Sequence, residues 1–269
     1  MTMTGTPVRE ALDSARIALE ASGVEDPRLD SEVLLAHALG IDRARLLTDR
    51  SLVVDGKPGR RFRDDVRLRS MQRVPVAYLT GHKPFRDIDV AVDQRVLIPR
   101  PETEHLVEAA LRLPEGAVVH EVGTGSGAVA LALARERPDL VVSGSDISPE
   151  AVQVARENAR RLGLAVDFVV ADLLDGIEKH DAVIANLPYV EEDAPLAAEL
   201  SHEPGLALFA GSDGLDVLRR FAAQVSAPWV ALEVGAGQAA TVAGLLPGYE
   251  TRTVRDLAGI ERIVIAWRP

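Results

Sequence analysis

The chain has 269 residues, of which 47% are hydrophobic and 26% charged, a composition typical of a globular protein rather than of a disordered chain or a membrane span. Its 30 basic and 41 acidic side chains give a net charge of −11, which disfavours a protein that holds duplex nucleic acid through many phosphate contacts. The absence of cysteine excludes disulfides, thiolate metal sites and cysteine nucleophiles. The histidines lack metal-site spacing and the first residues lack a signal-peptide pattern, so we expect a cytoplasmic protein with no metal and no membrane contact.

The charge is distributed unevenly along the chain. Residues 1–84 carry 14 Lys or Arg and 12 Asp or Glu, a net charge of +2, whereas residues 85–269 carry 16 and 29, a net charge of −13. Because the hydrophobic pattern changes as well, we expect an N-terminal helical domain of residues 1–84 and a second domain of residues 85–269. The first part of the second domain, residues 85–112, is expected to act as a linker.

The N-terminal domain is predicted to consist of short helices. Thr6 and Pro7 suit the cap and first turn of a helix that ends at Gly23, and a second helix ends before Gly40. Residues 60–73 contain six arginines around a thin apolar stripe, which predicts a helix with a basic face. That face is either a solvated surface or a docking surface for RNA or an acidic partner.

From about residue 117 the pattern alternates between apolar strands and amphipathic helices, which is typical of a parallel sheet covered by helices. The expected strands are residues 117–122, 140–145, 165–170, 180–185 and 229–233, and the expected helices are residues 128–137, 149–162, 214–224 and 238–246. The chain ends in two β-like runs, residues 249–254 and 262–267, with no helix between them. Two such consecutive strands predict an antiparallel pair at the edge of the sheet.

A glycine-rich turn follows the first of these strands. Residues 121–127 read Glu-Val-Gly-Thr-Gly-Ser-Gly. Gly123, Gly125 and Gly127 thus lie between a strand and a helix, where glycine lets the backbone approach a ligand closely. The amides at the start of the helix suit a carboxylate or a phosphate equally well. The turn indicates either a cofactor site or a tight structural bend.

Two acidic residues follow the next two strands. Asp146 ends the second strand, where a carboxylate can accept two hydrogen bonds from ribose hydroxyls, as in an enzyme that uses NAD. Asp172 follows the third strand and could accept a hydrogen bond from the amino group of adenine, with Leu173 covering the ring; alternatively, Asp172 simply ends the strand. These positions favour a nucleoside-containing cofactor.

Asn186, Leu187, Pro188 and Tyr189, which we call the tetrad, follow the fourth strand at the same edge of the sheet. Pro188 restricts Leu187 to an extended conformation, so that the Leu187 carbonyl and the Asn186 amide oxygen can both point into the cleft. Two fixed acceptors can hold one NH2 group, and Tyr189 adds an aromatic wall for a planar amide or base. The tetrad therefore predicts a substrate with an amino or amide nitrogen.

This combination resembles the amino-methyltransferases that use S-adenosylmethionine and carry such a tetrad after the fourth strand. Residues 78–108 and 202–220 resemble the release-factor glutamine N5-methyltransferase (HemK) family, and the resemblance runs from about residue 72 to the end of the chain. It implies an α/β, Rossmann-like class I methyltransferase with a seven-stranded, mostly parallel sheet and an antiparallel last strand. It also implies that the small all-helical domain in front recognises the substrate and that residues 85–112 line the pocket.

The resemblance implies roles for individual residues. The cofactor-binding residues expected on this basis are Glu121, Gly123, Thr124, Gly125, Ser126, Gly127, Asp146, Ile147, Asp172, Leu173 and Asn186. The catalytic residues would be Asn186, Leu187, Pro188 and Tyr189, and the same four would bind substrate with Arg100, Pro101 and Glu102. The cofactor would be S-adenosyl-L-methionine, and the product S-adenosyl-L-homocysteine. We expect Asn186 Oδ1 and the Leu187 carbonyl to accept the two N–H bonds of the substrate amide.

The implied substrate is the glutamine of the Gly-Gly-Gln loop in class I peptide-chain release factors. The chain departs from the family pattern at Leu187, where proline is usual, and at Glu121, where aspartate is common. Since position 187 contributes a backbone carbonyl, leucine can serve as well, and we retain the glutamine interpretation. We expect a monomer without a stable nucleic-acid partner.

Three alternatives are left open by the sequence alone. An N6-adenine methyltransferase of RNA or DNA would share the tetrad, a nicotinamide oxidoreductase would share the glycine-rich turn, and a non-enzymatic adaptor would bind S-adenosylmethionine and its partner without chemistry. Arg100 and Glu102 are expected either to line the pocket or to pair with each other. Residues 203–209, with Gly211, Asp213 and Gly214, are expected either at the far rim of the substrate opening or as a simple loop before the next helix. Glu233 is expected to start the helix that follows it rather than to act at the rim.

Overall fold

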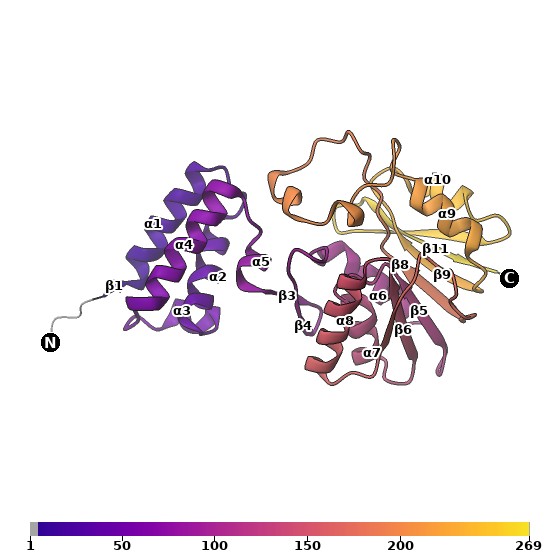
Figure 1. Ribbon diagram of the computed structural model, residues 1–269, viewed down its shortest axis with the longest axis horizontal. Helices are drawn as coiled ribbons and strands as arrows, with labels where there is room; N and C mark the ends of the chain where they lie inside the picture. The colour runs from indigo at the N-terminus through magenta and orange to yellow at the C-terminus, as the bar shows by residue number, and fades with distance from the viewer. Residues whose placement is uncertain (1–4, 269) are drawn as a thin grey trace. The chain divides into compact units, whose positions relative to one another are not determined.

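The computed structural model describes residues 5–268, which form two compact units (Figure 1). The first unit runs up to Gly81 and takes in the later segment Ala197–His202, and the second unit comprises His82–Leu196 and the chain from Glu203 onward. The sequence had suggested a division after residue 84. Nothing in the sequence indicated that residues 197–202 pack with the helical unit.

The first unit is a helical bundle with one very short pair of strands. Its elements are β1 (Thr6–Pro7), α1 (Val8–Ala21), α2 (Pro27–Leu39), α3 (Arg43–Thr48), β2 (Val53–Val54), α4 (Gly56–Gln72) and α5 (Val76–Thr80). Thr6 and Pro7 do not open the first helix as expected, because they pair with β2. Gly40 adopts a left-handed φ of 65° and ends α2, as the glycine there had indicated.

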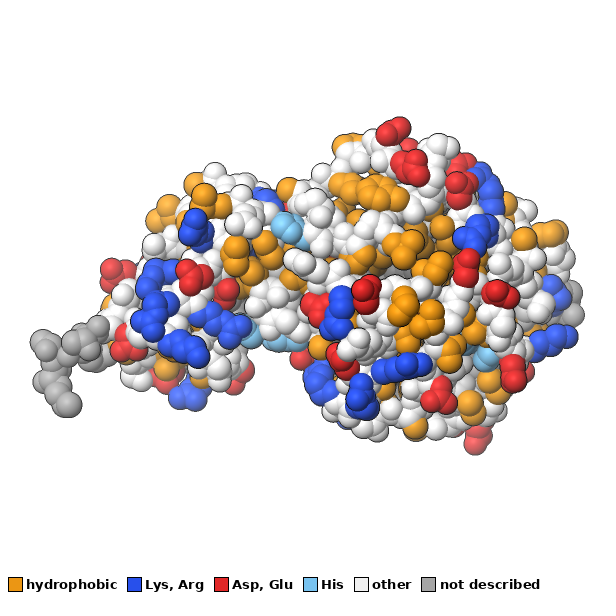
Figure 2. All heavy atoms as spheres, in the orientation of Figure 1, with side chains coloured by type: hydrophobic (Ala, Val, Ile, Leu, Met, Phe, Trp, Pro, Cys, Tyr) orange, Lys and Arg blue, Asp and Glu red, His pale blue; other side chains and the backbone are white. Residues whose placement is uncertain are grey.

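The arginines of α4 divide into an exposed and a buried group. Arg69 is only 8% exposed, and it donates to Asp30 Oδ2 at 2.7 Å and to Glu199 Oε1 at 2.9 Å. Arg73 lies 2.6 Å from the same Glu199 oxygen. The arginines that stay exposed are Arg60, Arg61, Arg63 and Arg67, and Lys and Arg side chains gather on the visible face of this unit (Figure 2). Arg69 and Arg73 bind Glu199 of residues 197–202, so the exposed basic face of α4 is smaller than the sequence predicted.

The second unit alternates strands and helices. Its strands are β3 (His82–Phe85), β4 (Ile88–Ala91), β5 (Val118–Val122), β6 (Val141–Asp146), β7 (Asp167–Val170), β8 (Ala182–Ala185), β9 (Trp229–Glu233), β10 (Glu250–Arg255) and β11 (Glu261–Trp267). Its α-helices are α6 (Glu104–Ala110), α7 (Ala128–Glu136), α8 (Pro149–Leu162), α9 (Asp216–Gln224) and α10 (Ala239–Gly244), and short 3-10 turns include η1 (Pro101–Thr103). The β3–β4 hairpin was not expected from the sequence.

The central sheet has seven strands in the order β10-β11-β9-β8-β5-β6-β7 (Figure 1). The pairs between β9 and β7 are parallel, whereas β11 runs antiparallel to both of its neighbours. This confirms the predicted mostly parallel sheet with an antiparallel last strand. From β5 the chain adds β6 and then β7 on one side, and later β8 and β9 on the other side. The order of the strands therefore reverses between β5 and β8, and a ligand site is expected there, at the carboxyl ends of the strands.

The core of the sheet is apolar on the side of α9. Leu218 and Phe221 of α9 are buried in one cluster with Leu232 of β9 and Val264 of β11. This packing fixes the carboxyl ends of β8 and β9 beside each other, which positions the residues that follow them. Among the described residues, no helix is long and apolar enough to cross a membrane.

Candidate active site

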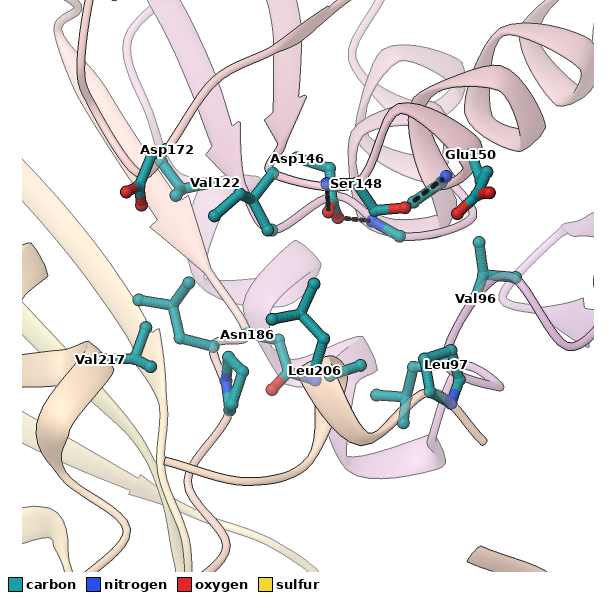
Figure 3. Close-up of a pocket in the computed structure, with 18 of the residues that line it drawn as sticks. Val96, Leu97, Val122, Asp146, Ser148, Glu150, Asp172, Asn186, Leu206 and Val217 are labelled. Atoms are coloured by element: carbon teal, nitrogen blue, oxygen red, sulfur yellow. Dashed lines mark hydrogen bonds between the residues drawn. The ribbon is translucent and has the colours of Figure 1, made fainter. Parts of the chain in front are cut away.

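A pocket of about 350 Å³ opens at the carboxyl ends of the parallel strands. Its walls come from the turns after β5, β6, β7 and β8, from residues 94–97, from residues 204–207 and from α9. Figure 3 shows Asp146 and Ser148 on one side of the open space, with Asn186 and Leu206 facing them. The pocket thus lies where the reversal of strand order predicts it.

Asp146 holds the glycine-rich turn in place. Its Oδ2 accepts a hydrogen bond from the Gly125 amide at 2.9 Å, and its Oδ1 accepts one from the Ser148 amide at 2.9 Å. Burial raises the pKa of this carboxyl group, and the backbone donors, which favour the charged form, oppose that rise. Each carboxylate oxygen retains further acceptor capacity, and Asp146 lines the pocket, so it can accept hydrogen bonds from a ligand's hydroxyl groups.

The glycine-rich turn needs glycine for two different reasons. Gly123, Gly125 and Gly127 all have φ between 53° and 80°, a left-handed conformation that other residues rarely adopt. In addition, a Cβ on Gly123 would lie 3.2 Å from Leu187 Cδ2, so this glycine allows the turn to pack against the tetrad. Gly123 and Gly125 line the pocket.

Glu121 lies behind the turn rather than on the pocket wall. Its Oε2 accepts hydrogen bonds from Thr124 Oγ1 at 2.5 Å and from the Ala130 amide at 3.0 Å, and burial raises its pKa to about 8. Of the predicted cofactor-binding residues, the structure brings Gly123, Gly125, Asp146, Ile147, Asp172, Leu173 and Asn186 to the pocket, while Glu121, Thr124, Ser126 and Gly127 are not among its lining residues. These last four residues contribute to the structure of the turn rather than to the pocket wall.

Asp172 and Leu173 form the end of the pocket beside α9. Asp172 Oδ2 pairs with Arg220 at 2.6 Å, and both side chains are about half exposed. Leu173 is buried and has a left-handed φ of 56°, which bends the chain directly after Asp172. Asp172 therefore offers an acceptor whose position Arg220 restrains, in a pocket that the apolar side chains of Leu206 and Val217 also line.

The tetrad begins on the pocket wall and turns inward. Asn186 Nδ2 donates a hydrogen bond to Thr103 Oγ1 at 3.1 Å, and Leu187 is buried. The tetrad residues that line the pocket are Asn186, Leu187 and Pro188. Tyr189 points its hydroxyl to Glu233 Oε1, 3.3 Å away, and burial together with Glu233 raises the pKa of Tyr189. The phenol consequently stays neutral and acts as a donor.

The expected substrate loop is arranged differently from either alternative suggested by the sequence. Arg100 pairs with Glu203, not with Glu102, and Glu203 Oε2 also accepts from the Ile98 amide at 2.9 Å. Arg100, Pro101 and Glu102 are not among the residues that line the pocket, and residues 94–97 line it instead. Residues 204–207 do lie at the pocket, as the sequence had indicated.

One buried residue of the site, Thr103, was missed, and a second, Glu233, was considered but assigned the wrong role. Thr103 is 4% exposed and contacts Asn186, and Glu233 is 1% exposed and contacts Tyr189. The predicted role of Glu233 at a helix start is wrong, because β9 ends at this residue and α10 begins only at Ala239. No group of three or more His, Cys, Asp or Glu residues that could hold a metal ion occurs among residues 5–268.

The chain matches two family models, the PrmC N-terminal domain over residues 10–81 and the methyltransferase small domain over residues 102–210. It is 40% identical to the release factor glutamine methyltransferase of Koribacter versatilis, over 97% of this chain and 99% of that protein, and 38% identical to that of Deinococcus radiodurans, over 97% and 98%.

Solved structures agree with these matches. The Mtq2-Trm112 complex of E. cuniculi, responsible for the methylation of the eRF1 translation termination factor, is similar with a TM-score of 0.50 and 25% identity, over 65% of this chain and 99% of that chain. A methyltransferase from Pyrococcus furiosus shares the fold, with a TM-score of 0.52 and 17% identity over 69% of this chain and 91% of that chain. The chain therefore belongs to the release factor glutamine methyltransferase family and is an enzyme of the class I methyltransferase fold.

Proposed function

We propose that this enzyme transfers a methyl group from S-adenosylmethionine to the side-chain amide nitrogen of a glutamine, and that this glutamine lies in the Gly-Gly-Gln loop of a class I release factor. The observation that carries the proposal is the arrangement of Asn186 on the pocket wall, where Nδ2 binds Thr103 and the amide oxygen is left to accept from a ligand. The names of the relatives support a release factor as the substrate.

The size and the lining of the pocket support S-adenosylmethionine as the cofactor. Its volume of about 350 Å³ falls within the range of small-molecule sites. Asp146 would accept hydrogen bonds from the ribose hydroxyls, Asp172 from the amino group of adenine, and the turn at Gly123 would pass close to the methionine part. When bound, the cofactor supplies a methyl group that a sulfonium centre has already activated. Leu173 and Leu206 offer the apolar surface that the adenine ring needs.

The protein's own contribution to the reaction is to orient a poor nucleophile. The lone pair of an amide nitrogen is delocalised into the carbonyl group, and a neutral-pH base cannot remove its proton beforehand. Asn186 Oδ1 and the Leu187 carbonyl would each accept one N–H of the substrate, which aims the nitrogen lone pair at the methyl donor. The same two oxygens stabilise the positive charge that develops on nitrogen, and the proton leaves after transfer.

The test is methyl transfer from labelled S-adenosylmethionine to a purified class I release factor, followed by mass spectrometry of the labelled residue. We expect the label on the glutamine of the Gly-Gly-Gln loop and none on a release factor in which alanine replaces that glutamine. Asn186→Ala should lower turnover by about 100-fold or more and should lower the affinity for the cofactor far less.

A second arm of the experiment offers ribosomal RNA in place of the release factor. Labelled adenine in that arm, with an unlabelled release factor, would replace this proposal by the N6-adenine alternative. Cofactor binding without label on either substrate would favour a non-enzymatic adaptor. If the Asn186→Ala variant had the same turnover as the unaltered enzyme, the role proposed for the Asn186 amide oxygen would be wrong.

A further inference from the structure

Residues 92–97 form part of the pocket wall without belonging to a helix or a strand. They follow β4, which ends at Ala91, and residues 94–97 line the pocket. Val96 and Leu97 lie along one side of the open space in Figure 3. Because no helix or sheet ladder supports the backbone of this segment, its position depends on individual contacts with the rest of the second unit.

At the first end of the segment, the side chain of Asn158 binds both polar groups of the Ala91 backbone. Asn158 Oδ1 accepts from the Ala91 amide at 2.8 Å, and Nδ2 donates to the Ala91 carbonyl at 3.0 Å. The second proton of Nδ2 goes to the Ser126 carbonyl at 2.9 Å. Asn158 belongs to α8, is fully buried and does not line the pocket, whereas Ser126 lies in the glycine-rich turn. One side chain therefore connects the segment to the turn that forms another part of the wall.

The hydrogen bonds at position 158 require an amide. They demand one acceptor and two donors from a single side chain, and a primary amide provides this combination with both of its protons in use. Aspartate would place carboxylate oxygens against two carbonyl oxygens, and leucine would offer no partner to any of the three backbone groups. Val92 and Val96 are also buried, but the burial of apolar surface has no direction, so the hydrogen bonds decide where the segment lies.

At the other end of the segment, Glu203 binds the Ile98 amide. Its Oε2 accepts from this amide at 2.9 Å, and its Oε1 pairs with the Arg100 guanidinium group. The side chain of Glu203 is 1% exposed and does not line the pocket, although residues 204–207, which follow it directly, do line it. The carboxylate therefore connects the segment to a third part of the wall.

The two contacts are costly unless they serve a purpose that apolar side chains cannot serve. Burying an amide or a carboxylate is unfavourable unless each forms hydrogen bonds, and apolar residues of similar volume often give equal or greater stability. Asn158 and Glu203 direct their hydrogen bonds to backbone groups at the two ends of one pocket segment. Such directed contacts determine a position, which apolar packing alone leaves less defined.

We propose that Asn158 and Glu203 are positioning residues of the pocket, which hold residues 92–97 at both ends and so fix the width of the cavity that receives the cofactor. That this cofactor is S-adenosylmethionine rests on the proposed function, whereas the two anchors rest on the hydrogen bonds given above. When one end is released, the segment can move, and the pocket loses affinity although every residue that lines it is still present.

The first readout is hydrogen exchange of two backbone amides in the full-length protein without ligand, followed by nuclear magnetic resonance. We expect slowed exchange of the Ala91 and Ile98 amides in the unaltered protein, because each donates to a buried side chain. Asn158→Leu should make the Ala91 amide exchange at least about tenfold faster, and Glu203→Met should do the same for the Ile98 amide. Both substitutions roughly keep the volume of the side chain and remove its polar atoms.

The second readout is the affinity for S-adenosylmethionine, measured by calorimetry. Asn158→Leu and Glu203→Met should each raise Kd about tenfold or more, whereas Glu203→Gln, whose amide oxygen still accepts from Ile98, should stay within about threefold of the unaltered protein. Leu140→Ala is the matched control. Leu140 is buried beside the amino end of β6, at the edge of the sheet away from the pocket, so this variant should lose stability without a change in Kd.

The combined variant, Asn158→Leu with Glu203→Met, tests whether both residues act through the same segment. Once one end is free, releasing the other end changes the pocket little. The increase in Kd should therefore be smaller than the product of the two single increases. Two unrelated structural losses would instead multiply.

The outcomes separate this inference from the proposed function. Rapid exchange of both amides in the unaltered protein overturns the positioning role, even if neither variant folds. Folded variants that bind S-adenosylmethionine as tightly as the unaltered protein, or single effects that multiply, overturn it as well. Slowed exchange and weaker cofactor binding by both variants, in a protein that methylates no glutamine, support the positioning role and reject the proposed substrate.

Discussion

Burial controls the charge of Glu121. In the unfolded chain this carboxyl group has a pKa near 4.5, and in the folded protein burial raises it to about 8, although Thr124 and the Ala130 amide donate to it. Between these two pH values the folded state binds one proton more than the unfolded state at this position. The free energy of unfolding therefore falls as the pH rises, by about 1.4 kcal/mol per pH unit from this group.

Glu121→Gln is expected to remove that pH dependence, because a carboxamide does not titrate and still accepts a hydrogen bond from Thr124. The free energy of unfolding of the variant relative to the unaltered protein should rise by roughly 3 kcal/mol or more between pH 5 and pH 8, measured by urea denaturation. The exposed Glu10→Gln serves as the control and should show no such trend. Parallel curves for Glu121→Gln and the unaltered protein would mean that Glu121 ionises normally.

Residue roles could be predicted where they follow from position after a strand. Asp146 ends a parallel strand, and Asp172 and Asn186 each follow one; because the carboxyl ends of such strands share one edge, their meeting at the pocket was foreseeable. Thr103 could not be found in this way, and Glu233, although it ends strand β9, was expected to start a helix instead. They contact Asn186 and Tyr189 from behind, and the side on which a buried side chain leaves a strand end depends on packing between segments that lie far apart in the sequence.

At the scale of elements, the turn after β8 is clamped by the loop before α9 and by the start of α10. Gly214 has a left-handed φ of 69°, and a Cβ there would lie 2.3 Å from the Tyr189 carbonyl oxygen. The same oxygen accepts from Gln238 Nε2 at 3.1 Å. Because the Tyr189 oxygen that such a Cβ would meet belongs to the backbone, rotation of a side chain cannot relieve the clash at position 214. The tetrad can therefore keep its place only if residue 214 has no side chain.

Gly214→Ala is expected to combine two effects that a control separates. The left-handed φ alone costs about 1 kcal/mol of stability, and Gly248→Ala, with φ of 81° and open space around it, should show this cost only. Gly214→Ala should in addition displace Tyr189 and lower kcat about tenfold or more. Urea denaturation and methyl-transfer kinetics measure the two effects. If the two variants had the same stability and the same kcat, the clamp would be without consequence.

The periodicity of the sequence located most helices and strands of the sheet within a few residues, because the helices bury one apolar face, the central strands are continuous buried apolar runs, and several helices end at glycine. The elements it missed depend on distant partners. Thr6 and Pro7 looked like a helix start, yet they pair with Val53 and Val54, and such pairing leaves no local pattern. The β3–β4 hairpin was hidden because β3 contains a lysine and a proline, and because the alternation of β4, with Ile88 and Val90 buried, extends over only four residues.

At the scale of the whole molecule, the chain leaves the second unit after Leu196 and returns to it at Glu203. The intervening residues 197–202 belong to the helical unit, where Glu199 pairs with both Arg69 and Arg73. The composition of these residues resembles an ordinary loop, and the arginines of α4 looked like a solvated face. Their pairing depends on two segments about 130 positions apart, which the sequence alone does not connect.

The division into two units predicts which functions survive removal of the first. Every residue that lines the pocket belongs to the second unit, so a chain of residues 82–269 should bind S-adenosylmethionine within about threefold of the affinity of the full chain, measured by calorimetry. A release factor is far larger than the pocket and needs additional contacts, so its methylation should fall by about 100-fold or more. A short peptide that carries the Gly-Gly-Gln sequence needs only the pocket, and both chains should methylate it at similar rates. If the shortened chain methylates the intact release factor as fast as the full chain, the helical unit does not contribute to substrate recognition. If the shortened chain also fails to methylate the peptide, residues 197–202 need their arginine partners to keep the site in order.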